Sequence, residues 1–166
     1  IVRRLVGSEM CIRDRLKRIE KFQDKKKIKL NIALHFDTGM SRLGFDRSET
    51  QRLIKSKTSL IKKSNVILVM SHLSCADNKN SKLNKTQLEL FNSISMHFPN
   101  CMHSLANSAG ILLGKKYHFD MVRPGISLYG GHSKKNEGKI YHDVISLHAK
   151  LIQVREIYEG DTIGYG

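Results

Sequence analysis

The amino-acid sequence predicts an α/β fold in which β-strands and α-helices alternate and the strands pair in parallel. Two strand patterns carry this prediction: an alternation of apolar and polar residues over 28–36, and a continuous apolar run over 66–70. A helical stripe of apolar residues follows each of them. From residue 139 the helical stripes end, and a strand–turn–strand pattern predicts the start of a second, β-type domain.

The first strand follows a short helix end at 16–22. Apolar residues at every second position indicate a strand with one apolar face, and here they are Ile28, Leu30, Ile32, Leu34 and Phe36. The opposite face ends in His35 and Asp37. The run Asp-Thr-Gly-Met-Ser-Arg-Leu-Gly at 37–44 then predicts a tight turn at Gly39 that presents Arg42.

The next unit is a helix followed by a buried strand. Asp46 and Ser48 each have Glu or Gln three residues later, which makes two overlapping capping boxes. They predict a helix that runs to about residue 63. The run over 66–70 has no polar alternation, which is typical of a parallel strand covered on both faces. It leads into Ser71 and His72.

The third unit repeats this order. Asn84 with Gln87 is a further capping signature, and the helix that it opens carries apolar residues as far as Phe98. Short strands are predicted over 101–105 and 118–122, with a helix opening at Asn107 between them. The second of these strands leads into the turn Arg-Pro-Gly at 123–125.

Composition limits the class of protein. Of 166 residues, 40% are hydrophobic and 27% charged, which is typical of a globular domain. No apolar run approaches the ~20 residues of a membrane span, so we expect a cytoplasmic protein that does not bind membranes. Three cysteines without CxxC spacing predict reduced thiols and no metal site. The net charge of +14 comes from scattered lysines, which is typical of a solvated surface and argues against a nucleic-acid site.

The chain divides into four segments. Residues 5–15 resemble translated sequencing-adapter sequence, and residues 1–15 are interpreted as a non-native leader, the alternative being a short charged helix start. Residues 16–130 hold the strand–helix units, 131–138 form a polar linker, and 139–166 begin the β domain. The sequence stops directly after a strand pattern, which indicates an incomplete domain.

The polar groups of interest all follow the C-terminal end of a predicted strand. They are His35, Asp37, Arg42, His72, Asn107, Ser108, Arg123 and Gly125. That end is the active-site face of a βα barrel and the ligand crevice of an open sheet. Structural alternatives exist: His35 could be a core histidine bonded to Asp37, Asp37 could cap its own turn, and Asn107 could be only an N-cap. Ser108 at a helix N-terminus is also typical of a phosphate site.

Five motifs taken together resemble the alanine racemase family. They are Asp-Thr-Gly-Met-x-Arg-Leu-Gly at 37–44, Ser-His at 71–72, Asn-Ser-Ala at 107–109, His-Phe-Asp-Met-Val-Arg-Pro-Gly-Ile-x-Leu-Tyr-Gly at 118–130, and Gly-Asp-x-x-Gly-Tyr-Gly at 160–166. Their order and spacing match from about residue 16 to residue 166.

The resemblance implies a partial (βα)8 TIM-type barrel, the later half of the family's cofactor-binding barrel, followed by the beginning of a C-terminal β domain. It implies pyridoxal 5′-phosphate as cofactor and alanine as substrate. The reaction is racemisation of L- and D-alanine by two-base proton transfer at Cα, which supplies D-alanine for cell-wall peptidoglycan. The family's enzyme is a homodimer whose active sites are shared between subunits.

The resemblance also implies roles for single residues. It places the cofactor contacts at Arg42, His72, Asn107, Ser108, Arg123, Gly125 and Ile126. Arg123 would face the pyridine nitrogen, and Ser108 with the backbone of Gly125 would hold the phosphate. Arg42 would also reach the substrate carboxylate, and Tyr165 would be one of the two catalytic bases, acting in the partner subunit's site.

Two departures from the family pattern affect function. The Schiff-base lysine, the family's second base, would lie before residue 16 and is not in this chain, so we expect the chain as given to be inactive. Many relatives carry a carbamylated lysine at the position of His35, and its negative charge fixes the arginine at Arg42. Histidine cannot carry that carbamate. We therefore expect an inorganic anion or Asp37 to balance Arg42.

Other functions stay open from the sequence. One is an amino-acid racemase of broader specificity, because the residues that set substrate breadth are not in this chain. Another is a non-catalytic barrel protein that binds pyridoxal phosphate, although the β pattern after residue 139 argues against its single-domain forms. A basic nucleic-acid-binding module is the third, for which the scattered lysines predict only weak, non-specific binding.

Overall fold

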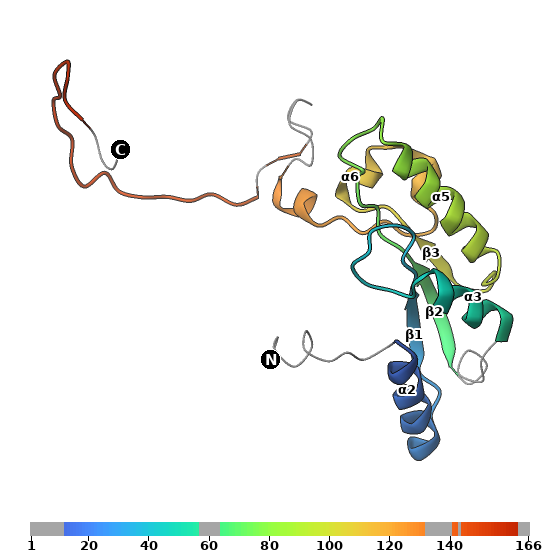
Figure 1. Cartoon of the computed structure of the whole chain (residues 1–166). Coiled ribbons are helices and arrows are strands. Elements are labelled where there is room, and N and C mark those ends of the chain that lie inside the picture. Colours follow the sequence, from blue (N-terminus) through green and yellow to red (C-terminus); the bar gives the residue numbers. More distant parts are fainter. Residues whose placement is uncertain (1–11, 57–63, 132–140, 143, 163–166) are drawn as a thin grey trace.

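The computed structural model describes residues 12–56, 64–131, 141–142 and 144–162 (Figure 1). Helices and strands alternate in the order α2 (Ile12–Lys26), β1 (Asn31–His35), α3 (Arg47–Ser56), β2 (Asn65–Met70), α5 (Lys82–Ser95), β3 (Met102–Ser104) and α6 (Ser108–Ile111). Two short 3-10 helices follow, η1 (Lys115–Tyr117) and η2 (Ile126–Tyr129). The predicted alternation of strands and helices is confirmed over this part of the chain.

The three strands form one parallel sheet in the order β1–β2–β3, which confirms the predicted α/β class. At the C-terminal end, His35 pairs with Met70, and Met70 pairs with Ser104. Nearer the N-terminal end the register shifts, because Ile67 is an extra residue in β2. Parallel strands need crossover connections, which α3 and α5 supply. All three strands therefore end at the same edge of the sheet.

The hydrophobic core lies between the sheet and the helices α3 and α5. Phe36 is fully buried there, with its ring centroid 5.2 Å from that of Phe45 and 5.7 Å from that of Phe98. The side chains buried with it come from both strands and helices and include Leu34, Val69, Leu53, Phe91 and Ile94. Burying each such side chain is worth about 1.5–3 kcal/mol, so this layer holds the sheet against its helices.

The opposite face of the sheet is open near the N-terminal ends of the strands, whereas at their C-terminal ends Ser104 is fully buried and accepts a hydrogen bond from Arg123. Ala33, Leu68 and Met102 are register neighbours on it, and Met102 is 47% exposed. We expected other elements to cover β2 on both faces, but among the described residues helices cover only one face. The C-terminal row of the opposite face is His35, Met70 and Ser104.

Of the predicted helix N-caps, the one at Asp46 is confirmed and the one at Asn84 is not. Asp46 Oδ1 accepts from the Glu49 N–H at 2.7 Å, and Glu49 Oε2 accepts from the Asp46 N–H at 3.2 Å, so the predicted capping box is confirmed. The end of that helix, predicted over 57–63, lies outside the described residues. The cap predicted at Asn84 is wrong: α5 begins after Ser81. Asn84 is buried and donates from Nδ2 to the carbonyl of Asn78 at 2.8 Å.

The strand predicted over 118–122 does not form. The N–H groups of Asp120 and Met121 both donate to the carbonyl of His103 in β3, at 3.1 and 3.2 Å. The His103 N–H, however, donates to the side chain of Asp120 at 2.8 Å. Because a carboxylate replaces a main-chain carbonyl, no regular ladder continues. The segment still runs beside β3, and the Arg123 N–H donates to the carbonyl of Ala106 at 2.9 Å.

The two ends of the chain differ from the sequence expectations. Helix α2 begins at Ile12, so residues 12–15 of the expected leader are helical. Residues 144–162 form no strand and run away from the sheet (Figure 1), with Leu147 97% exposed. A strand needs a pairing partner, which the described residues do not offer here. The predicted turn does form, closed by the Asp161 N–H donating to the carbonyl of Tyr158 at 3.0 Å.

The proposed segment boundaries stay predictions, and residues 132–138 of the linker lie outside the described part. Within the described ranges, no helix has the length and apolar character that crossing a membrane requires.

Candidate active site

The polar residues singled out in the sequence gather at the C-terminal edge of the sheet. His35 ends β1, Ser71 and His72 follow β2 directly, and Asn107 and Ser108 come soon after β3. Because neighbouring strands are parallel and in register at this edge, their following loops are neighbours too. The expected convergence is therefore observed for His35, His72, Asn107 and Ser108.

The turn after β1 is built around one carboxylate oxygen. Asp37 Oδ1 accepts from the N–H groups of Gly39, Met40 and Ser41, at 2.9, 2.9 and 3.1 Å. Burial would raise the pKa of Asp37, but these hydrogen bonds outweigh it and hold the pKa below its ordinary value. The structural alternative for Asp37, a cap of its own turn, is thus correct.

Arg42 follows this turn and does not form the expected ion pair with Asp37. Asp37 and Arg42 form no salt bridge with one another, so the expectation that Asp37 balances Arg42 is wrong. The three backbone N–H groups all bind Oδ1 and so orient the carboxylate towards its own turn. His35 does not bond to Asp37 either. Its pKa is lowered by burial first and then by Arg123 and Arg42, although Asp37 opposes the shift.

His72 is held as a neutral imidazole. Its pKa is lowered from 6.5 to about 4, first by burial and then by the charges of Arg123 and Arg42. Its Nε2 accepts a hydrogen bond from Asn107 Nδ2 at 3.3 Å. Asn107 Nδ2 also donates to the carbonyl of Leu73 at 3.0 Å. The ring therefore pairs with Asn107 and not with Arg123, which acts on it only through its charge.

Asn107 is also a helix N-cap, as the sequence predicted. Its Oδ1 accepts from the Gly110 N–H at 2.9 Å, which makes it the N-cap of α6. One amide thus starts a helix and orients His72. The structural and functional alternatives for this residue are compatible with one another.

Arg123 spans the ends of two strands. Its Nε donates to Ser104 Oγ at 2.9 Å, and its Nη2 donates to the carbonyl of Ser71. Burial lowers the pKa of the guanidinium, but an arginine stays protonated in proteins. The segment beside β3 fixes the backbone of Arg123, and the two hydrogen bonds fix its guanidinium, so both ends of the side chain are held. This makes Arg123 a rigid, permanent cation at the sheet edge.

Ser108 gathers backbone N–H groups from the loop that follows Arg123. Its Oγ accepts from the N–H of Gly125 at 2.8 Å and from that of Ser127 at 3.4 Å. Ser127 Oγ is buried and has no hydrogen-bond partner in the described residues. Ile126 lies between these two loop positions. Hydroxyl and backbone N–H groups are the donors that a phosphate group takes, and here the two N–H groups are directed at Ser108 Oγ.

The electrostatic balance of this edge favours an anion. Arg42 and Arg123 are cations, and both lower the pKa values of His35 and His72. The carboxylate of this edge, Asp37, is turned into its own loop. Among the described residues, no three His, Cys, Asp or Glu side chains are placed to hold a metal ion. The arrangement suits a ligand that carries phosphate or carboxylate.

Sequence reasoning missed some buried polar residues at this edge. Thr38, Ser71 and Gln87 are each at most 3% exposed, and Thr38 hydrogen-bonds to both of the others. Thr38 and Gln87 are 49 residues apart in the chain, so no local pattern connects them. The one signal present, Gln87 three residues after Asn84, suggested a helix cap instead. Tyr165, the expected catalytic base, lies outside the described residues.

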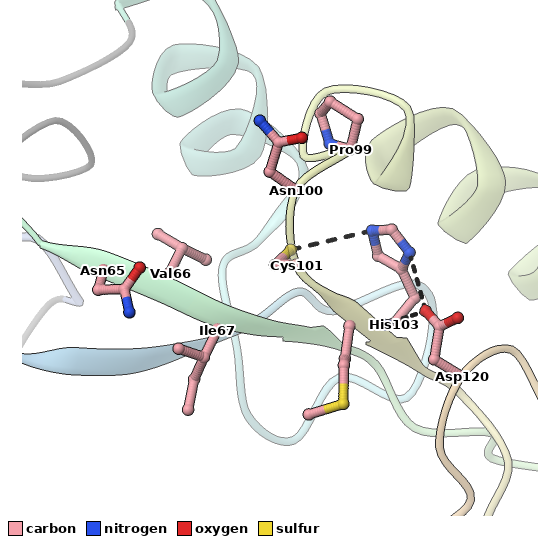
Figure 2. Close-up of a pocket in the computed structure, with 9 residues that line it drawn as sticks. Asn65, Val66, Ile67, Pro99, Asn100, Cys101, His103 and Asp120 are labelled. Carbon is pink, nitrogen blue, oxygen red and sulfur yellow. Dashed lines mark hydrogen bonds and ion pairs between the residues drawn. The ribbon is translucent and has the colours of Figure 1, made fainter.

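A groove at the opposite, N-terminal end of β2 and β3 is a weaker candidate (Figure 2). It contains Cys101, whose Sγ lies 4.0 Å from His103 Nε2, and His103 Nδ1 lies 3.4 Å from Asp120. Burial and then Asp120 raise the pKa of the Cys101 thiol, and Sγ donates to the carbonyl of Phe98 at 3.3 Å. A protonated thiol bound in this way is not an activated nucleophile.

Known proteins similar to this chain agree with one another. The family model "Alanine racemase, N-terminal domain" matches residues 11–133. The biosynthetic alanine racemase of Agrobacterium fabrum is 43% identical over 134 residues, covering 81% of this chain and 34% of that protein. The alanine racemase of Rickettsia bellii is 40% identical over 150 residues, covering 88% and 36%. The chain therefore spans about a third of the length of these relatives.

A solved structure gives the same result. The alanine racemase from Bartonella henselae with covalently bound pyridoxal phosphate is similar with a TM-score of 0.65 at 38% identity, over 69% of this chain and 33% of that one. Together with the parallel sheet described above, this likeness confirms the expectation of a partial α/β barrel.

Proposed function

Because this chain belongs to the alanine racemase family, we propose that it supplies one wall of a pyridoxal 5′-phosphate site in an enzyme that interconverts L- and D-alanine. One observation carries the proposal. The Ser108 hydroxyl, the N–H groups around it and the Arg123 guanidinium meet at the C-terminal edge of one parallel sheet. A (βα)8 barrel places its active site at that edge.

The residues present fit the cofactor's phosphate. Ser108 Oγ is within hydrogen-bond reach of two loop N–H groups, those of Gly125 and Ser127, and Ile126 lies between them. Asn107, as N-cap of α6, fixes the turn on which Ser108 sits. We propose that these groups hold the phosphate, with Asn107 supporting them.

Arg123 and His72 would flank the cofactor ring. Pyridoxal phosphate, when bound, withdraws electrons from the substrate and so weakens its Cα–H bond. Arg123 is a permanent donor, so it would hold the ring nitrogen as an unprotonated acceptor. It would thereby limit how far charge spreads from Cα, which would favour return of the proton to that carbon over transamination. His72, neutral above about pH 4, adds no further positive charge.

Arg42 would bind the substrate carboxylate and the cofactor's phenolic oxygen. It directly follows the turn that Asp37 caps at the end of β1. Because Asp37 does not pair with it, the remaining part of our expectation is that an inorganic anion balances Arg42. Binding the carboxylate aligns Cα with the catalytic bases, which is an entropic contribution to the rate.

The proton transfers themselves need groups beyond the described residues. We propose that Tyr165 is one base and acts in the partner subunit's site of a homodimer. Its phenol, with an ordinary pKa of ~10, becomes a useful base when cations lower that value. The second base is the lysine that the family resemblance places before residue 16. We further propose a cytoplasmic enzyme that supplies D-alanine for peptidoglycan.

A graft tests this function. Residues 16–130 would replace the aligned segment of the Agrobacterium fabrum racemase, and the formation of D-alanine from L-alanine would be measured with added pyridoxal phosphate. We expect the graft to form D-alanine and the 166-residue chain alone to form none. The host enzyme lacking the segment is the control.

Two outcomes would contradict the proposal. A folded graft that binds pyridoxal phosphate and yields no D-alanine would show that the segment does not do what the family's segment does. Racemisation by the chain alone would overturn the expected inactivity.

A further inference from the structure

A buried amide joins the loops that follow β1 and β2. Gln87, in α5, is fully buried and uses both ends of its side chain. Its Oε1 accepts from the N–H of Ser74 at 3.0 Å and from the Ser74 hydroxyl at 3.1 Å. Its Nε2 donates to the carbonyl of His72 at 2.9 Å and to Thr38 Oγ1 at 3.3 Å. One side chain on a helix thus holds main-chain and side-chain groups of two loops.

The hydrogen bonds of Gln87 continue into a pair of hydroxyls, those of Thr38 and Ser71. Thr38 Oγ1 lies 2.6 Å from Ser71 Oγ, so the loops after β1 and β2 also meet directly. Thr38 and Ser71 are 3% and 1% exposed, which keeps this network out of bulk water. Leaving one such buried group unpaired costs about 1–3 kcal/mol, so the network stabilises one arrangement of the loops against others.

We propose that Gln87 is a positioning residue of the site: its amide fixes the His72 backbone relative to the turn that carries Arg42. This proposal rests on the proposed function for the roles of His72 and Arg42. Gln87 touches neither imidazole nor guanidinium, and it acts through the carbonyl of His72 and the hydroxyl of Thr38. Its helix is anchored in the core by Phe91 and Ile94, which gives the bridge a rigid base.

The helix offers a matched control for this proposal. Asn84 lies nearly one turn earlier on α5, is also an amide, and is 1% exposed. Its Nδ2 donates to the carbonyl of Asn78 at 2.8 Å, in the loop before α5. Loss of the Asn84 amide therefore removes a buried hydrogen bond of the same kind without touching His72 or Thr38.

The test measures the titration of His72 by NMR in the full 166-residue chain, with the signal assigned by a His72→Gln variant. The charged and titratable groups that act on His72 are Arg123, Arg42 and His35. In the parent chain we expect a midpoint near the pKa of about 4. In Gln87→Met, which keeps the side-chain volume, the midpoint should rise by about one pH unit toward its ordinary value. In Asn84→Leu it should not move.

A folded Gln87→Met chain that titrates as the parent does would overturn the proposal, as would equal shifts in Gln87→Met and Asn84→Leu. If Gln87→Met does not fold, Thr38→Val decides, because it removes one end of the bridge at constant size. We expect amide exchange at Met40 and Ser41 to speed up about tenfold in Thr38→Val, and unchanged exchange would contradict us. Neither measurement uses catalysis, so failure of the racemase assignment would be seen separately.

Discussion

In the graft that carries residues 16–130, Arg123→Lys is expected to slow the formation of D-alanine by about 100-fold or more. The guanidinium donates to Ser104 Oγ and to the carbonyl of Ser71 at the same time. A lysine ammonium keeps the charge but lacks the planar fork that reaches two strand ends and a ligand together. Steady-state kcat and KM for L-alanine measure the effect, and we expect most of it in kcat.

Arg52 provides the control for this substitution. It makes a similar pair of contacts, from Nε to the carbonyl of Ser48 at 3.2 Å and from Nη2 to Ser48 Oγ at 2.8 Å. These contacts lie on the exposed surface of α3 and join no residue of the site. Arg52→Lys should therefore leave the rate unchanged. A graft with Arg123→Lys that is as active as its parent would show that Arg123 is not part of the reacting site.

Gly44→Ala is expected to destabilise the chain by about 3 kcal/mol or more. Gly44 has φ +107°, and a Cβ there would meet the carbonyl oxygen of His35 at 2.8 Å and the nitrogen of Asp37 at 2.9 Å. These are backbone atoms at the end of β1, and they are held by hydrogen bonds to Phe45. They cannot move without opening the turn that carries Arg42. Chemical denaturation of the 166-residue chain measures the free energy of unfolding.

Gly114 separates the two causes of this loss. It has a similar φ of +115°, but a Cβ there would meet nothing within 4 Å. Gly114→Ala therefore reports the backbone strain alone, which we expect to be about 1–2 kcal/mol. Equal losses at the two glycines would contradict the steric account and would mean that the end of β1 can relax.

The strands that position the site were predictable because each has a strong local pattern. The alternation that ends at His35 and the apolar run that ends at Met70 both form strands, and both lie in the predicted parallel sheet. The capping box at Asp46 was equally local, since both of its hydrogen bonds join residues three positions apart. Local patterns of this kind need no knowledge of the rest of the fold.

The features that could not be predicted depend on distant partners. Residues 118–122 have a strand-like sequence, but Asp120 places its carboxylate where a main-chain carbonyl would continue the ladder. Residues 144–162 have strand periodicity without a partner strand in the described part of the chain. Gln87 was interpreted as part of a helix cap, because nothing local shows that Thr38 and His72 lie beside it.

The site was only partly predictable for the same reason. The motifs correctly indicated that His72, Asn107, Ser108 and Arg123 share one edge. They did not indicate that the ring of His72 pairs with Asn107, or that Asp37 serves its own turn in preference to Arg42. These hydrogen-bond partners depend on which donor lies nearest in the folded loops. The loop positions in turn depend on burial and geometry across the whole sheet.

The central claim is that this sheet edge belongs to an enzyme that removes and returns the Cα proton of alanine. It is tested most directly by following L-alanine in D2O by NMR, with the graft and pyridoxal phosphate present. We predict loss of the Cα proton signal together with D-alanine formation until the two enantiomers are equal. A graft that binds the cofactor yet leaves the Cα proton of L-alanine in place would contradict the claim.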